Sequence, residues 1–253
     1  MGDSKILTKV TKNGVFVVNQ KGARIEKLIL DSQLLLTKVT RSDGKIGSSH
    51  PCVPIFGPET LTSFGLKQHG DARNQLWKIL SSENYGAIFS YEVQDKGYPR
   101  GLSITQRFTI ADGVFELITE CVNNGEESLP VNFGEHFYWD ALDGGWDKLT
   151  INGLSMTDEV KKTGVIKLKP RNIIDFHHKN KKPIVLKQQG LDWAVLWFEK
   201  DNDTVSLKSW VCIEPVEGNP KEDFFGSEKS MIFPGQSRET ELKISLSKSF
   251  NIF

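Results

Sequence analysis

The chain has 253 residues, of which 38% are hydrophobic and 25% are charged, proportions typical of an ordinary globular protein. Lys and Arg together number 32, and so do Asp and Glu, which gives a formal net charge of zero. A neutral chain has no global positive field, so we expect neither a nucleic acid nor an anionic membrane as a partner.

The three cysteines, Cys52, Cys121 and Cys212, are odd in number and widely spaced. This pattern favours reduced thiols in a reducing compartment over a disulfide framework. The first residues lack the long apolar core of a signal peptide, and apolar runs such as 194–198 are too short to cross a bilayer. The sequence therefore predicts a cytoplasmic protein, and it leaves the oligomeric state open.

Turn signals recur at short intervals along the whole chain. Between them lie short runs rich in Val, Ile, Leu, Thr and Phe, which are typical of strands. The signals are Asn13-Gly14, Lys21-Gly22, Asp43-Gly44, Asp112-Gly113, Asn124-Gly125, Gly144-Gly145, Asn152-Gly153 and Gly218.

The segment 102–122 carries the clearest strand pattern. An Asp-Gly pair between two alternating runs is a strong signal for a β-hairpin, and here that pair is Asp112-Gly113. Phe115 and Leu117 fall out of phase with the other apolar residues of the second run, so both faces of that strand are predicted to be partly covered. The in-phase residues are Ile104, Phe108 and Ile110 before the turn, and Val114, Ile118 and Val122 after it.

Helical signals are weak. No window of helical length combines an apolar face with capping signals, although Thr157–Lys162 could form a turn or two. No linker or repeat divides the chain. Many short strands without alternating helices predict an all-β protein, a large antiparallel β-sandwich forming a single domain over residues 1–253.

Histidine is scarce, and two of the five occur in segments with chemical potential. His69 lies four residues before Arg73, a combination of hydroxyl donor and guanidinium that suits a polyhydroxyl or phosphorylated ligand. His136 lies among aromatic residues, a mixture that suits a carbohydrate pocket because ring faces stack on sugars. Each segment also fits a purely structural interpretation. His69 and Arg73 fit a surface turn with an ion pair, and His136 fits a core histidine with a satisfied hydrogen bond. The aromatic residues are Phe133, Phe137, Tyr138 and Trp139.

Glu214 follows an alternating run and precedes Pro215, which cannot continue a central ladder. We therefore expect Glu214 at a strand end, where a carboxylate is placed either for acid–base work or simply in solvent. His177 and His178 could suggest a metal, but neighbouring side chains on a strand point to opposite faces. No Asp, His or Glu cluster completes a ligand set, so we expect no metal.

Five segments, in this order, resemble the aldose 1-epimerase (galactose mutarotase-like) family over residues 50–246. They are Pro51–Pro58, Gln68–Asn74 with Trp77, Gly134–Tyr138, Cys212–Pro215 with Gly218, and Phe233–Gln236. The stretch from Phe56 to Trp77 looks like the hexose-6-phosphate mutarotase branch. The segment Glu214-Pro215 with Gly218 looks more like the branch that acts on unphosphorylated sugars.

The resemblance implies a β-supersandwich and an isomerase that interconverts the anomers of a hexose or hexose 6-phosphate without a cofactor. By position, Glu214 matches the general base and His136 the general acid. His69 and Arg73 match substrate-binding positions, and Asp192 matches, more loosely, a residue that binds a sugar hydroxyl. The reaction removes the C1 hydroxyl proton while the ring oxygen is protonated, so we expect the base and the acid on opposite sides of the ring.

Several positions depart from the family pattern. This chain has Asp71 where the family usually has an aromatic residue, Phe137 in place of a common proline, and Val216 in place of a frequent tryptophan. Ser48-Ser49-His50 replaces an expected glycine pair. These departures leave open a non-catalytic carbohydrate-binding β-sandwich. They also leave open whether the sugar is phosphorylated. A phosphate site would need another cation near Arg73, which Lys67 or Arg100 could supply only if folded nearby.

Overall fold

The structure is a computed structural model that describes residues 4–57, 64–140, 182–197, 210–222 and 224–247. It also describes the backbone of short strand segments at 150–151, 154–155, 165–167, 173–177, 200–201 and 204–205. Over this part of the chain the regular structure is almost entirely β, with two short 3-10 helices, η1 (Ala72–Asn74) and η3 (Glu228–Ser230). The predicted turn at Thr157–Lys162 lies outside the described residues.

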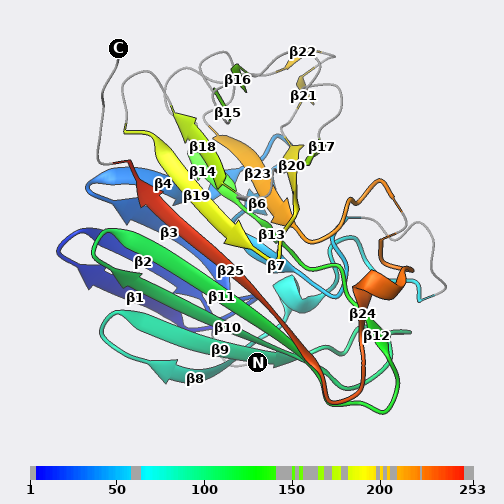
Figure 1. The fold of residues 1–253 in the computed structure, drawn as a ribbon. Coiled ribbons are helices and arrows are strands. Elements are labelled where there is room, and N and C mark those ends of the chain that lie inside the picture. Colours follow the sequence, from blue (N-terminus) through cyan, green and yellow to red (C-terminus); the bar gives the residue numbers. More distant parts are fainter. Residues whose placement is uncertain are drawn as a thin grey trace.

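Two large antiparallel sheets face each other and enclose the core (Figure 1). In the first sheet the strands are β1 (Ile6–Thr11), β2 (Gly14–Asn19), β3 (Arg24–Leu30), β4 (Gln33–Thr37), β14 (Tyr138–Asp140), β23 (Trp210–Val216), β13 (Gly134–His136) and β7 (His50–Cys52). On the other side of β23 lie β20 (Trp193–Trp197) and then β17 (Val165–Lys167).

In the second sheet the strands are, in spatial order, β16 (Leu154–Ser155), β15 (Thr150–Ile151), β18 (Ile173–His177), β19 (Ile184–Gln189), β25 (Ser237–Leu246), β11 (Val114–Asn123), β10 (Leu102–Ala111), β9 (Gly86–Glu92) and β8 (Lys78–Ser82). Three small pairs are β12 (Leu129–Pro130) with β24 (Met231–Ile232), β5 (Val39–Thr40) with β6 (Ile46–Gly47), and β21 (Lys200–Asp201) with β22 (Thr204–Val205). The predicted antiparallel all-β sandwich is confirmed.

Strands β10 and β11 form the predicted hairpin around Asp112 and Gly113. Both turn residues have positive φ, +49° and +76°, the conformation of a tight turn whose twist matches the flanking strands. On β11 the buried phase is the one with Phe115 and Leu117, while Val114 is half-buried. Both faces of this strand are therefore partly covered, as its out-of-phase apolar residues predict.

The core lies between the two sheets. Phe16 of β2 packs edge-on against Phe115 of β11, with ring centroids 5.5 Å apart, and lies 6.4 Å from Phe108 of β10. Alternation along each strand sends every second side chain into this layer, and the other residues face outward. Among the described residues, no helix is long and apolar enough to cross a membrane.

Candidate active site

The site is built on the outward face of β7, β13 and β23, where three neighbouring strands bring three titratable side chains into one row. Gly134 pairs with Val216, and Tyr138 with Cys212, so the register sets His136 directly opposite Glu214. On the other side of β13, His136 pairs with His50 of β7. Directly opposite residues on one face are close neighbours, so these three side chains stand together although they are far apart in sequence.

Alternation on the same strands separates this face from the core. Phe137 and Trp139 point inward and are fully buried, while His136 and Tyr138 share the outward face, their rings stacked with centroids 4.9 Å apart. Of the four aromatic residues in the predicted carbohydrate pocket, only Tyr138 lines the cavity, and Phe133 also belongs to the core. The aromatic cluster is thus chiefly a core feature, because successive residues of a strand face opposite sides.

The expectation that Glu214 sits at a strand end is wrong. Strand β23 continues through Pro215 to Val216 and pairs with β20 from Cys212 to Val216. The proline interrupts the hydrogen-bond ladder only on the side of β23 that faces β13. On that side Glu217 donates its backbone N–H to the Phe133 carbonyl at 2.9 Å, and the next backbone N–H in line would belong to residue 215. Proline has no N–H, so the missing ladder bond falls there and β23 stays central.

A cavity of about 840 Å³ opens over this row of side chains. It brings together four of the five predicted site residues: Glu214, His136, His69 and Arg73. The other lining residues are Arg24, Arg41, Lys45, Ile46, Gly47, His50, Phe56, Gly57, Gln68, Asn74, Tyr138, Val195, Leu196, Trp197, Pro220 and Lys221.

His136 and Glu214 are in direct contact at the base of this cavity, with Nε2 and Oε1 3.4 Å apart. Glu214 is only 2% exposed and His136 7%. The Glu214 Oε1 and His136 Nδ1 atoms have no hydrogen-bond partner among the described residues. A buried polar atom left unpaired is costly, so these two atoms stay available to a polar ligand in the cavity.

Burial disfavours charge on both groups. It raises the pKa of Glu214 well above the ordinary value, and it lowers the pKa of His136, with the nearby His69 and Arg73 acting in the same direction. Both shifts act against the ionised form of the pair, and two titratable groups in contact titrate as a single coupled unit.

His69 lies at a sharp turn before η1. Gly57 donates its backbone N–H to Nδ1 at 3.1 Å, which leaves the ring proton on Nε2 as a donor. Burial, together with Arg73, lowers the pKa of His69 to about 3, so the ring is neutral. Gly70 follows with a φ of +66°, and a Cβ there would collide with the Val53 carbonyl. This explains why glycine follows the histidine in this segment.

The fifth predicted residue is not brought to this cavity. Asp192 is exposed and does not line it. Three of the four departures from the family pattern, at Asp71, Phe137 and Val216, are also off the cavity wall, whereas His50, part of the fourth, lines the cavity. Asp71 accepts hydrogen bonds from Lys67, Asn74 and Gln75 beside η1.

Sequence reasoning missed part of the lining. It assigned no role to His50, whose Nδ1 lies 2.8 Å from the Ser48 carbonyl and whose ring stacks on His136 at 4.9 Å. Arg24, Arg41 and Trp197 also went unnoticed. Their neighbours in sequence give no chemical signal, and only the pairing of distant strands brings them here.

One group of side chains has the composition of a metal site. His136, Cys212 and Glu214 each offer a ligand atom, and these atoms lie within 4.8 Å of one another. Nitrogen, sulfur and oxygen donors of this kind suit a zinc-like ion. The sequence predicts no metal here, because it does not show that Cys212 lies opposite Tyr138, next to the acid–base pair.

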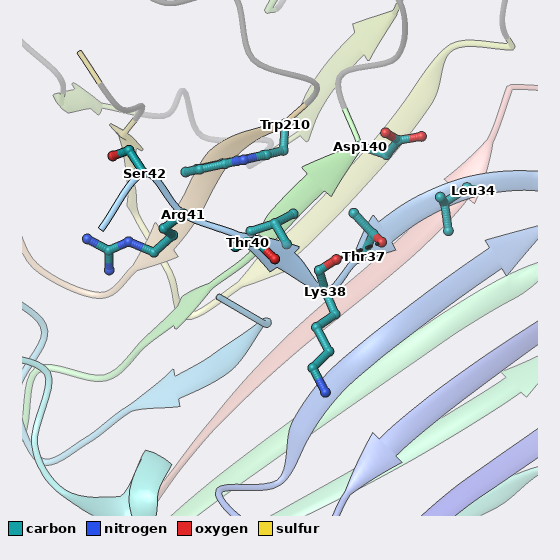
Figure 2. A pocket seen from close by; sticks show the side chains of 9 residues that line it. Leu34, Thr37, Lys38, Thr40, Arg41, Ser42, Asp140 and Trp210 are labelled. Carbon is teal, nitrogen blue, oxygen red and sulfur yellow. Dashed lines mark hydrogen bonds between the residues drawn. The ribbon is translucent and has the colours of Figure 1, made fainter. Parts of the chain in front are cut away.

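A second cavity, of about 640 Å³, lies beside the first, and Figure 2 shows its lining. Arg41 lines both cavities, and its guanidinium lies 5.1 Å from the ring centroid of Trp197. The residues of the second cavity are Leu34, Thr37, Lys38, Val39, Thr40, Arg41, Ser42, Asp140 and Trp210.

Comparison with known proteins identifies the class. The model of the family described as aldose 1-epimerase matches residues 28–165, which is more than half of the chain. The protein belongs to the aldose 1-epimerase family. A comparison with curated protein sequences found no match.

Solved structures share the fold over almost the full length. A galactose mutarotase related enzyme from Lactobacillus acidophilus has a TM-score of 0.78 at 15% identity, covering 98% of this chain and 99% of that one. A galactose mutarotase-like protein from Lactobacillus casei has a TM-score of 0.75 at 14% identity, with 96% and 100% covered. A galactose 1-epimerase from L. acidophilus gives 0.74 at 13%, with 98% and 96% covered. The fold is thus the galactose mutarotase-like supersandwich.

Proposed function

We propose that the protein is an aldose 1-epimerase that interconverts the α and β anomers of a hexose or hexose 6-phosphate. The observation that carries the proposal is the buried contact between His136 and Glu214, with their unpaired atoms at the base of a cavity large enough for a sugar. An acid and a base side by side are the minimum machinery for opening and closing the ring.

A single proton on the pair is enough for the whole cycle. Ring opening starts with this proton on His136 and with Glu214 ionised: Glu214 takes the C1 hydroxyl proton while His136 gives its proton to the ring oxygen. The pair again holds one proton, which is now on Glu214. Rotation about the C1–C2 bond and closure with the roles reversed produce the other anomer and restore the first state.

The geometry changes one detail of the sequence-based mechanism. At 3.4 Å, the His136 and Glu214 atoms leave no room for a ring between them, so they do not stand on opposite sides of the sugar. The C1 hydroxyl oxygen and the ring oxygen are both bonded to C1. In our proposal the sugar therefore presents that edge to the pair, with His69 and Arg73 fixing its orientation.

The proposal includes a cytoplasmic location and chemistry that uses no cofactor. All three cysteines are buried thiols outside any disulfide, which suits a reducing compartment.

The direct test follows the mutarotation of fresh α-glucose and α-galactose by polarimetry and the anomer exchange of glucose 6-phosphate by NMR, each with and without the protein. The proposal predicts faster mutarotation of at least one free or phosphorylated hexose. Sugar binding with no acceleration of any hexose would contradict it and would support the non-catalytic carbohydrate-binding alternative.

A further inference from the structure

The cavity has an unusual balance of charge for a site that binds a neutral sugar. Among the residues that the structure describes, five cationic side chains line it, Arg24, Arg41, Lys45, Arg73 and Lys221, against one carboxylate, that of Glu214. The chain as a whole is neutral, so this is a local concentration of positive charge. Low-dielectric walls strengthen such a field inside a cleft.

Two of these cations lack an acidic partner. Arg41 and Lys45 both form ion pairs with Asp43 at 3.4 Å. Among the described residues, Arg24 and Arg73 form no ion pair and are held by neutral acceptors only. Arg24 donates to the Arg73 carbonyl at 2.9 Å and to Ser48 Oγ and Asn74 Oδ1 at 3.3 Å.

Arg73 is held in the same way. It donates from Nη2 to the Gln68 carbonyl at 2.9 Å, and its Nη1 lies 3.3 Å from His50 Nε2. Its Nε is buried and has no partner among the described residues. Burial lowers the pKa of Arg24, and the like charge of the nearby Arg73 acts in the same direction. Arg24 and Arg73 thus bring two guanidinium groups, neither paired with a carboxylate among the described residues, to the wall of one cavity, where they suit an oxyanion.

We propose that the sugar substrate carries an anionic group, a phosphate or a carboxylate, and that Arg24 and Arg73 bind this group together. Arg24 is then the residue that makes the site selective for a charged aldose. The inference rests on the proposed function and names its substrate class. The neutral groups already around both arginines orient them without cancelling their charge, which is what selective binding of an anion needs.

The structure also excludes the two cations suggested by the sequence. Lys67 pairs with Asp71 at 3.1 Å and does not line the cavity. Arg100 lies in a different pocket, with Pro99, Gly101 and Asn124. The second cation comes instead from β3, at Arg24.

The test compares anomer exchange of glucose 6-phosphate, glucuronate and glucose by NMR, in the wild type and in Arg24→Gln. The measured quantity is the ratio of kcat/KM for each anionic sugar to that for glucose. Because this ratio is taken within one preparation, the amount of folded protein cancels. Lys27→Gln, which removes an exposed cation from the same strand, is the matched control.

We expect the wild-type ratio to favour one of the two anionic sugars, and the faster one identifies the anion as phosphate or carboxylate. Arg24→Gln should lower that ratio about 10- to 100-fold, the effect of one charge-assisted partner, and Lys27→Gln should not change it. Arg24→Lys keeps the charge but loses the planar guanidinium, so its ratio should lie between those of the wild type and Arg24→Gln. A wild-type ratio near one, or equal losses in Arg24→Gln and Lys27→Gln, would overturn the proposal.

Binding is measured separately from turnover. Calorimetric titration with inorganic phosphate at low salt should show binding to the wild type and weaker binding to Arg24→Gln. Phosphate binding without anomer exchange on any sugar would reject the proposed function and keep the anion site. Anomer exchange of neutral glucose without phosphate binding would support the proposed function and reject the anion site.

Discussion

At the scale of residues, burial acts on His136 and Glu214 in opposite directions, and this determines the expected pH dependence. The lowered pKa of His136 means that a second proton binds the pair only in acid, and the raised pKa of Glu214 means that the last proton leaves only in base. We therefore expect kcat/KM to form a broad plateau through neutral pH and to fall on both sides. A rate that follows one titration near pH 6.5, the ordinary value for histidine, would contradict this.

The same pair predicts the effect of a chelator. The proposed proton transfers use His136 and Glu214 and no metal, so dialysis against EDTA should leave the rate of anomer exchange unchanged. Loss of activity on dialysis and its recovery with zinc would contradict this prediction. That result would point to the ligand group formed with Cys212.

Individual residues differ in how far the sequence could place them. His136, Glu214, His69 and Arg73 stand in segments that resemble a family, and the structure brings all four to one cavity. Arg24 belongs to no such segment. It lies 49 positions from Arg73, and the two meet only because β3 passes beside η1.

At the scale of elements, one buried polar cluster joins the two sheets. Glu135 of β13 accepts a hydrogen bond at 2.5 Å from Gln106 of β10, which also donates to Thr119 of β11. Glu135 is 1% exposed, and burial raises its pKa to about 8, a shift opposed only in part by the bond from Gln106. The folded protein therefore keeps this carboxyl protonated at neutral pH.

This cluster makes the stability of the protein depend on pH. Because the folded pKa lies above the unfolded value near 4.5, the stabilisation is complete below pH 4.5 and is lost as pH rises toward 8. Glu135→Gln cannot ionise, so this loss should be absent from the variant. Between pH 5 and pH 8 the free energy of unfolding of the variant should therefore fall less than that of the wild type. The difference should be a few kcal/mol, at about 1.4 kcal/mol per pKa unit. Urea titrations of both proteins at both pH values measure it, and a difference independent of pH would contradict the account.

Elements with local signals were the predictable ones. Asp112 and Gly113 define their hairpin because the turn requires their positive φ. The end of β23 was misjudged at Pro215, since proline breaks the ladder on one side only and the sequence does not show which side has a partner. The register that sets His136 opposite Glu214 likewise depends on long-range pairing.

At the scale of the whole molecule, the two sheets share one core. Its members run from Phe16 of β2 to Leu246 of β25, and they include Trp139 of the first sheet and Trp77, which precedes β8 of the second. We propose that residues 1–253 fold as one unit. Thermal unfolding followed by tryptophan fluorescence and by far-UV circular dichroism should give coincident transitions, and two separate midpoints would argue against a single domain.

The central claim is that His136 and Glu214 perform the proton transfers of mutarotation. The most direct measurement is the anomer-exchange rate of Glu214→Gln beside the wild type, with Glu239→Gln as an exposed control for the same loss of charge. The account predicts that folded Glu214→Gln loses about 10²- to 10⁴-fold in rate, the usual worth of one positioned proton transfer, while Glu239→Gln keeps the wild-type rate. Near-wild-type exchange by folded Glu214→Gln would contradict it.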